Sequence, residues 1–196
     1  RMIQKLGEKN EDRMVTASFG LHAGVTLSDK TLEKCAEAIP EGHGFHIHVA
    51  EDKIDEKESE KLYGVNVVTR LNQFKITGEN SIFVHGVHLN DDEIDTIHQT
   101  GTWLTHQPRS NMNNAVGMAN VEKMVQRGIP ICMGNDGFSF SMWDEWRTCY
   151  LAHKLWSQDP RRMGADQVVD IAAYNNARMA TKFFNGKIGV IQEGAL

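Results

Sequence analysis

The sequence has few cysteines, no long apolar run and no excess of basic charge. Its three cysteines, Cys35, Cys132 and Cys149, are odd in number and lie far apart in apolar segments, which indicates buried free thiols in a reducing compartment. No stretch approaches the roughly 20 apolar residues that cross a membrane, and the opening residues show no basic leader before an apolar run. We therefore expect a cytoplasmic protein without a membrane partner.

Charge and composition further restrict the kinds of partner and fold that we expect. The 196 residues carry a formal net charge of −5, so we expect no nucleic acid partner. The fractions of hydrophobic (40%) and charged residues (24%) are typical of a globular domain, and the length suffices for one sizeable core. The chain has only four prolines and no repeat, low-complexity tract or Pro/Gly-rich linker. We therefore predict that residues 1–196 form a single domain with a small-molecule substrate.

Strand-like runs alternate with helical periods along the chain. The expected strands cover residues 14–23, 44–49, 81–89, 103–106 and 129–137. Ser28 and Asn90 are expected helix caps, and Gly101 and Gly128 are expected helix ends. No hairpin signal joins neighbouring strands, so the pattern predicts an α/β fold with a parallel sheet, either an open wound sheet or a barrel.

Polar side chains lie at or near the end of each expected strand. His46 and His48 share one face of their strand because residues two apart point the same way, and Glu51 follows them. In a parallel barrel, such strand ends meet at the rim where active sites are built. Imidazole and carboxylate are ligands of zinc and iron. The residues that we expect at this rim, one from each strand, are His22, His48, His85, His106 and Asp136.

Four motifs resemble, in this order, the amidohydrolase superfamily. They are Phe-His-Ile-His-Val-Ala-Glu at 45–51, Val-His-Gly-Val-His-Leu at 84–89, Gln-Pro-Arg-Ser-Asn-Met at 107–112 and Gly-Asn-Asp-Gly at 134–137. They are most similar to the branch of chlorohydrolases and of cytosine, guanine and S-adenosylhomocysteine deaminases. Residues 20–29 are similar to aminohydrolases associated with selenium metabolism. The resemblance implies a distorted (β/α)8 barrel with one divalent metal ion, zinc or iron.

The resemblance also implies roles for individual residues. His48 and Asp136 would bind the metal, Glu51 would carry protons, and His85 would orient the attacking water, so that Glu51, His85 and Asp136 form the catalytic group. The expected substrate contacts are His22, His46, Asn111 and His106. Two of these have alternatives, because Asn111 could pin a loop and His106 could be a packing residue. The expected reaction is deamination of an amino-heterocycle, and the alternatives are dechlorination, another C–N hydrolysis or a catalytically lapsed barrel.

The resemblance breaks at the start of the chain. The superfamily begins its barrel with a His-x-His that supplies two metal ligands, and no such motif precedes Met14. We therefore expect a fragment that covers barrel strands four to eight, without the first strands and the small β domain, to which residues 187–196 would begin the return. The remaining metal ligands would come from the missing first strand. Alone, the fragment is expected to be inactive and to associate, for example as a homodimer, through open barrel edges.

Overall fold

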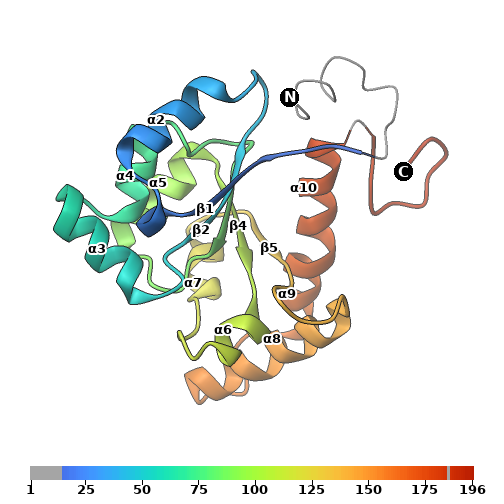
Figure 1. The fold of residues 1–196 in the computed structure, drawn as a ribbon. Helices are drawn as coiled ribbons and strands as arrows, with labels where there is room; N and C mark the ends of the chain where they lie inside the picture. Colours follow the sequence, from blue (N-terminus) through green and yellow to red (C-terminus); the bar gives the residue numbers. More distant parts are fainter. Residues whose placement is uncertain (1–14, 185) are drawn as a thin grey trace.

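Five parallel strands form one sheet in the order β1-β2-β3-β4-β5 (Figure 1). The structure is a computed structural model that describes residues 15–184 and 186–196. The strands are β1 (Phe19–Ala23), β2 (Phe45–Val49), β3 (Ile82–His85), β4 (Trp103–His106) and β5 (Ile131–Met133). All four neighbouring pairs are parallel. The predicted α/β class is confirmed, although the strands expected at 14–23, 81–89 and 129–137 are shorter than predicted, and Met14 lies outside the described residues.

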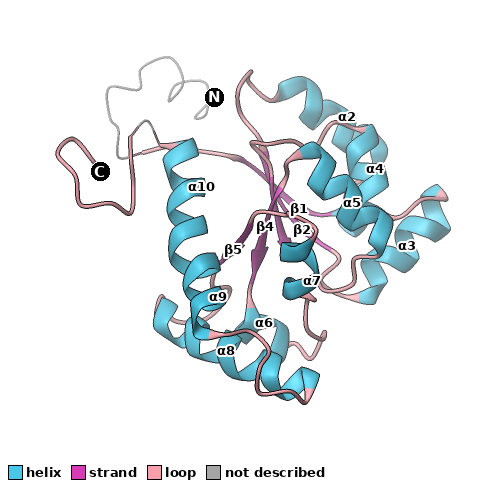
Figure 2. Ribbon diagram, turned by 180° about the vertical axis from the view of Figure 1, so that it is seen from behind, coloured by secondary structure: helices cyan, strands magenta, loops and turns pink. Residues whose placement is uncertain are grey.

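Helical segments connect the strands and cover the sheet (Figure 2). The predicted caps are present: Ser28 Oγ accepts a hydrogen bond from the Thr31 amide, and Asn90 and Glu93 form a reciprocal capping box. Gly101 ends its helix in the left-handed conformation, at φ 66°. The helical segments are η1 (Gly24–Thr26), α2 (Asp29–Ala38), α3 (Lys53–Tyr63), α4 (Val67–Gln73), α5 (Asp91–Thr100), α6 (Pro108–Asn113), α7 (Val121–Gln126), α8 (Met142–Ser157), α9 (Ala165–Val169), the π-helical η2 (Asp170–Tyr174) and α10 (Asn175–Phe183).

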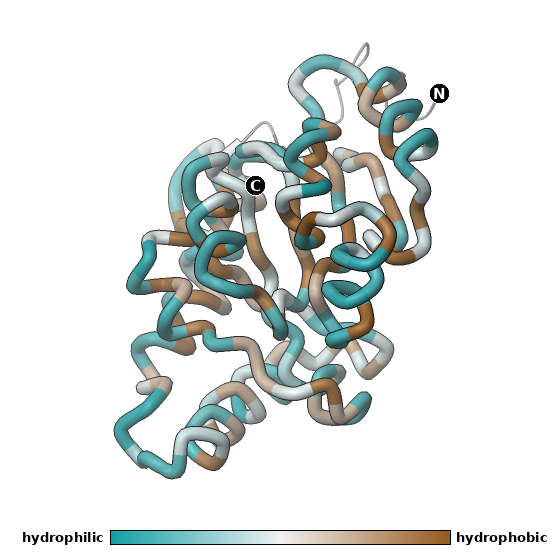
Figure 3. The backbone as a smooth tube through the Cα atoms, turned by 90° about the vertical axis from the view of Figure 1, so that its left-hand side faces the viewer, coloured by the Kyte–Doolittle hydropathy of each residue, from teal (hydrophilic) through white to brown (hydrophobic). Residues whose placement is uncertain are grey.

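The core lies between one face of the sheet and the surrounding helices. In β2, Phe45, Ile47 and Val49 are buried, whereas His46 is exposed and His48 half-buried on the other face, as the alternation predicted. Hydrophilic segments predominate in the outer turns of the backbone (Figure 3). Apolar residues from the helices complete the core, among them Leu32, Val68, Leu71, Ile94, Ile97, Met124 and Ile171. Burial on one face leaves the polar face of the sheet free to carry chemistry.

The outer edge of β5 is covered by side chains from the helical segment that begins at α9. α9, η2 and α10 follow one another beside β5 (Figure 1). Asn175 Nδ2 donates to the Ile131 carbonyl at 2.7 Å, and the Asn176 amide bonds both N and O of Met133, at 3.0 and 2.8 Å. An open edge was expected here, but asparagine side chains make hydrogen bonds to backbone N–H and C=O groups along the outer side of β5. The helices in the described part of the chain include none with the length and apolar character of a membrane-spanning segment.

Candidate metal and catalytic site

His85 ends β3 in a conformation that few residues adopt. Its φ is 77°, and Gly86 follows at φ 60°. The His85 amide donates to Gln107 Oε1 at 3.1 Å, and its ring nitrogen Nδ1 lies 2.9 Å from Asn111 Oδ1. Because an amide oxygen only accepts, Nδ1 carries the proton, and Nε2 keeps its lone pair.

The free nitrogen of His85 faces two carboxylates. Nε2 lies 3.4 Å from Glu51 Oε2 and 3.8 Å from Asp136 Oδ2. The ring is fully buried, and Nε2 has no hydrogen-bond partner among the described residues. Burial lowers the pKa of His85, although the Glu51 carboxylate opposes the shift, so the ring is neutral at pH 7. A neutral nitrogen between two carboxylates is a suitable ligand for a cation.

One short segment holds all three members of this group. Ser110 Oγ donates to Asp136 Oδ2 at 2.8 Å, and Asn114 Nδ2 donates to Glu51 Oε1 at 3.1 Å. Together with Asn111, these residues belong to α6 and its C-terminal cap. Ser110 and Asn114 were not among the site residues predicted from the sequence. A signal was present, because positions 110, 111 and 114 share one face of a helical turn directly after the strand end at His106.

His48 lies beside this group. Its Nδ1 donates to the His22 carbonyl at 2.6 Å, which leaves Nε2 available. The His48 ring stacks on the His85 ring, with the two ring centroids 5.5 Å apart. His22, His48 and Glu51 line a pocket of about 250 Å³. The His22 ring is exposed, with Nδ1 2.9 Å from Thr26 Oγ1. His46 is exposed on the same face of β2 as His48.

The two other expected substrate contacts are buried. Asn111 is 0% exposed and engaged with His85, and His106 is 0% exposed with its Nε2 3.2 Å from His153 Nε2. His153 was not among the residues predicted for the site. It lies in α8 and is 1% exposed, because α8 packs this side chain against the end of β4.

Arg109 is committed to an ion pair. Its Nε lies 2.6 Å from Oε1 of the fully buried Glu145, and its Nη2 donates to the Ser139 carbonyl at 2.9 Å. The guanidinium is thus held by these partners and is not free to take an anionic substrate. Instead it fastens the loop after β5 to the start of α6 and α8.

Asp55 ties the loops after β1 and β2 together. Its Oδ1 accepts from the Val25 amide at 2.9 Å and its Oδ2 from the Ala50 amide at 2.8 Å. Ala50 directly precedes Glu51 and has a φ of 49°, so the buried carboxylate fixes the turn that presents Glu51. The sequence alone gave no reason to single out Asp55.

The residues in this group fit a divalent cation. One ligand atom each from Glu51, His85 and Asp136 lie within 4.8 Å of one another, and the buried, unpartnered Nε2 of His85 points at this space. One nitrogen and carboxylate oxygens are a donor set of zinc and non-haem iron sites. His48 and Asp136 were the ligands expected from the resemblance. In the structure, Glu51 and His85 are the residues grouped most tightly with Asp136.

Similar proteins include deaminases that are longer than this chain. The 5'-deoxyadenosine deaminase of Methanopyrus kandleri is 32% identical over 186 residues, which are 92% of this chain and 42% of that protein. The 5-methylthioadenosine/S-adenosylhomocysteine deaminase of Syntrophomonas wolfei is 34% identical over 169 residues, which are 83% of this chain and 39% of that protein. The chain thus spans about two fifths of the length of these relatives.

Solved structures share the fold. An adenosine deaminase from Xanthomonas campestris with bound zinc superposes with a TM-score of 0.87 at 23% identity, over 99% of this chain and 44% of that one. Guanine deaminase from E. coli superposes with a TM-score of 0.81 at 24% identity, over 98% of this chain and 46% of that one. An atrazine chlorohydrolase from Arthrobacter aurescens superposes with a TM-score of 0.75 at 20% identity, over 100% of this chain and 45% of that one. The predicted part-barrel fold is confirmed.

The predicted superfamily is confirmed by a match along the whole sequence. The model of the amidohydrolase family covers residues 1–196, and so includes all four motifs and each residue of the site described above. The chain belongs to the amidohydrolase family.

Proposed function

We propose that the whole protein is a metal-dependent aminohydrolase that deaminates an amino-heterocycle, the adenine ring of a 5'-modified nucleoside being the first candidate. The observation that carries the proposal is the neutral Nε2 of His85, buried and unpartnered between the carboxylates of Glu51 and Asp136. The substrate class is supported by the names of the two relatives described above, which are at least 32% identical to the chain.

Hydrolytic deamination replaces an amino group with oxygen. The oxygen of water adds to the ring carbon that bears the amino group, the C–N bond breaks, and ammonia leaves. A bound divalent cation supplies the acidity that makes hydroxide available near pH 7. Asp136 and the Nε2 of His48 are the proposed ligands from this chain for one zinc or iron ion, and further ligands are expected from outside it.

The chain's own residues would orient water and move protons. His85 accepts a hydrogen bond at Nε2 and so fixes the direction of attack, because Asn111 holds its proton on Nδ1. Glu51 lies 3.4 Å from that nitrogen with its side chain 29% exposed. It can therefore take a proton from water and deliver it to the leaving amine. Asp136 is held in place by a hydrogen bond from Ser110, and its carboxylate would offset the positive charge of the bound cation.

Substrate would approach over the exposed face of the sheet. His22 and His46 are exposed on β1 and β2, and His22 also lines the pocket next to His48 and Glu51. They remain the proposed substrate contacts. Asn111 and His106 are buried, and their hydrogen bonds favour the loop-pinning and packing roles that were the alternatives.

Ammonia release tests the proposal. The whole protein, loaded with zinc or iron, would be assayed on 5'-deoxyadenosine, S-adenosylhomocysteine, adenosine and guanine. We expect release from at least one nucleoside and a loss of about 10²–10⁴-fold in kcat for Glu51→Gln. Glu60→Gln makes the same chemical change on the exposed face of α3 and should retain full activity.

Two results would contradict deamination. Chloride release from a chlorinated triazine without any ammonia release would favour the second candidate, a chlorohydrolase that uses the same groups. No turnover by a protein that still binds one metal ion at this site would favour a lapsed barrel. The cytoplasmic location and a homodimer remain predictions from the sequence.

A further inference from the structure

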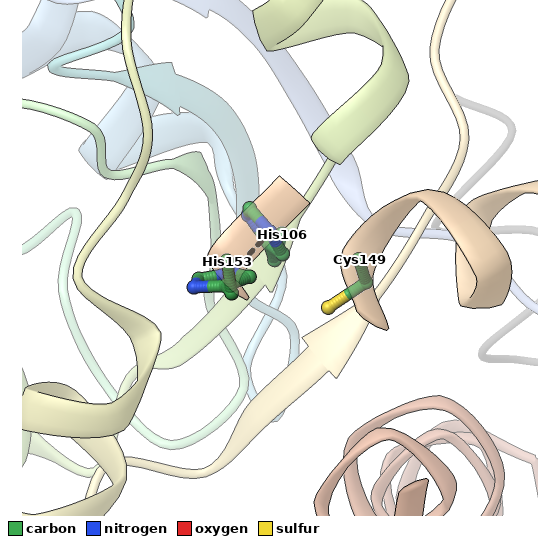
Figure 4. Close-up of side chains that lie close together, drawn as sticks. All are labelled: His106, Cys149 and His153. Atoms are coloured by element: carbon green, nitrogen blue, oxygen red, sulfur yellow. Dashed lines mark hydrogen bonds between the residues drawn. The ribbon is translucent and has the colours of Figure 1, made fainter. Parts of the chain in front are cut away.

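A second group of potential metal ligands lies where α8 packs on the end of β4. It consists of His106, the last residue of β4, and of Cys149 and His153 on α8 (Figure 4). Their exposed fractions are 0%, 0% and 1%. One ligand atom from each lies within 4.8 Å of the others. Three donors from two elements therefore converge in a space that is closed to solvent.

The spacing of these residues suits a shared cation. Cys149 and His153 are four residues apart and so lie on one face of α8, the face towards His106. The Nε2 atoms of His106 and His153 are 3.2 Å apart. Two nitrogen ligands at 2.0–2.1 Å from a tetrahedral zinc ion would be separated by about 3.3–3.4 Å. The observed separation is thus compatible with a cation as well as with a direct N–H···N hydrogen bond.

The hydrogen bonds around this group leave one ring nitrogen unused. The Nδ1 of His106 has no hydrogen-bond partner among the described residues. Internal hydrogen bonds therefore do not use the full capacity of this ring. Two neutral imidazoles and a sulfur form a donor set that favours zinc over magnesium or calcium.

We propose that His106, Cys149 and His153 form a second, structural site for a thiophilic transition-metal cation, with zinc as the expected occupant. Binding makes two metal–nitrogen bonds and one metal–sulfur bond, and the thiol of Cys149 loses its proton to solvent. The cation would fasten α8 to β4 immediately before Gln107, whose Oε1 accepts from the His85 amide. The site shares no residue with the catalytic group, so it does not depend on the proposed hydrolytic function.

Cobalt substitution tests the site directly. The whole protein would be stripped of metal and titrated with Co²⁺ while the near-ultraviolet thiolate-to-cobalt absorption is recorded. We expect this absorption in the wild type, release of about one proton for each ion that takes a thiol ligand, and loss of the band in Cys149→Ala. Cys132→Ala is the matched control, because Cys132 is also a fully buried free thiol but lies on β5 outside the cluster.

Two further variants separate this site from the catalytic one. Asp136→Asn should weaken metal binding at the catalytic group and leave the thiolate band intact. His153→Gln can still hydrogen-bond to His106 but should lose the band together with one equivalent of cobalt. The proposal is overturned if the wild type shows no thiolate band, or if the band survives Cys149→Ala or His153→Gln. Thermal unfolding in excess chelator confirms that each variant is folded.

Discussion

At the scale of single residues, the chemistry of the site depends on which nitrogen of His85 carries the proton. Asn111 Oδ1 fixes that proton on Nδ1, and the carboxylates of Glu51 and Asp136 then face a lone pair. If Nε2 carried the proton instead, it could not accept a hydrogen bond from the attacking water. The side chain of Asn111 is therefore a positioning group in the proposed enzyme.

Asn111→Ala should reduce activity without removing any proposed catalytic residue. Loss of the acceptor leaves the buried Nδ1–H of His85 unsatisfied, which costs about 1–3 kcal/mol of stability. Comparable supporting residues of metal sites contribute about 10–100-fold in activity or metal affinity. The kcat of the variant and its pH profile measure the effect. Asn80→Ala is the control, since Asn80 Nδ2 makes one bond, to the Gly42 carbonyl, before the start of β3. Equal losses in both variants would exclude a specific role.

A buried carboxyl pair predicts how stability depends on pH. Burial, followed by the charge of Glu93, raises the pKa of Glu56 from 4.5 to about 8. Between these values the folded state holds a proton that the unfolded state has lost, so this group makes the free energy of unfolding fall as pH rises from about 4.5 to 8. Glu56→Gln should flatten the fall, as measured by denaturant unfolding at pH 5.5 and 8, pH values chosen inside that window. An unchanged slope would contradict the raised pKa of Glu56, and Glu60→Gln serves as the exposed control.

At the scale of elements, the site is assembled by the segments that follow the strands. α6 holds His85, Asp136 and Glu51 through Asn111, Ser110 and Asn114, the last at its C-terminal cap. The loops after β1 and β2 are tied by Asp55. The strand ends supply the reacting groups, and the following segments fix their directions.

The π-helical turn matters because it brings two asparagines to the edge of β5. Asn176→Ala removes both bonds to Met133 and exposes or leaves unpaired one N–H and one C=O of the strand. We expect a loss of about 1–3 kcal/mol in the free energy of unfolding, measured by denaturant titration. Asn72→Ala, at an exposed position in α4, should cost less, since its side chain only accepts from Thr77 Oγ1. A smaller loss for Asn176→Ala than for this control would contradict the edge-capping role.

At the scale of the whole molecule, the described chain leaves much apolar surface open. On α8, Trp143, Leu151 and Leu155 are 70%, 60% and 79% exposed. β1 pairs only with β2 among the described strands, so its other edge is available for pairing. Exposed apolar area and a free strand edge both favour association.

The isolated 196-residue chain should therefore associate. We expect a particle larger than the 22.1 kDa monomer in sedimentation velocity, with the larger species increasing with concentration. Leu155→Glu should shift the equilibrium towards monomer if α8 takes part. A monodisperse monomer at all concentrations would contradict this prediction.

Much of the architecture followed from local pattern. The alternation in β2, the caps at Ser28 and Asn90 and the helix end at Gly101 depend on near neighbours in the sequence, and the structure has them where predicted. The predicted strand lengths were less accurate, because an apolar run does not show where the chain turns away from the neighbouring strand. The strand at 81–89 ends at His85 since the backbone turns there into a left-handed conformation.

Local patterns in the sequence were enough to predict the α/β class, the family and the set of polar strand ends, because periodicity and motifs are properties of adjacent residues. The tertiary structure sets which of those residues meet. It grouped His85 with Glu51 and Asp136, placed His106 with Cys149 and His153, and gave Ser110, Asn114 and Asp55 their partners. Those contacts join residues 26 or more positions apart, apart from the one between Asp55 and Ala50 and the helical pair Cys149 and His153. They depend on the curvature of the sheet and the packing of α6 and α8, which no local pattern encodes.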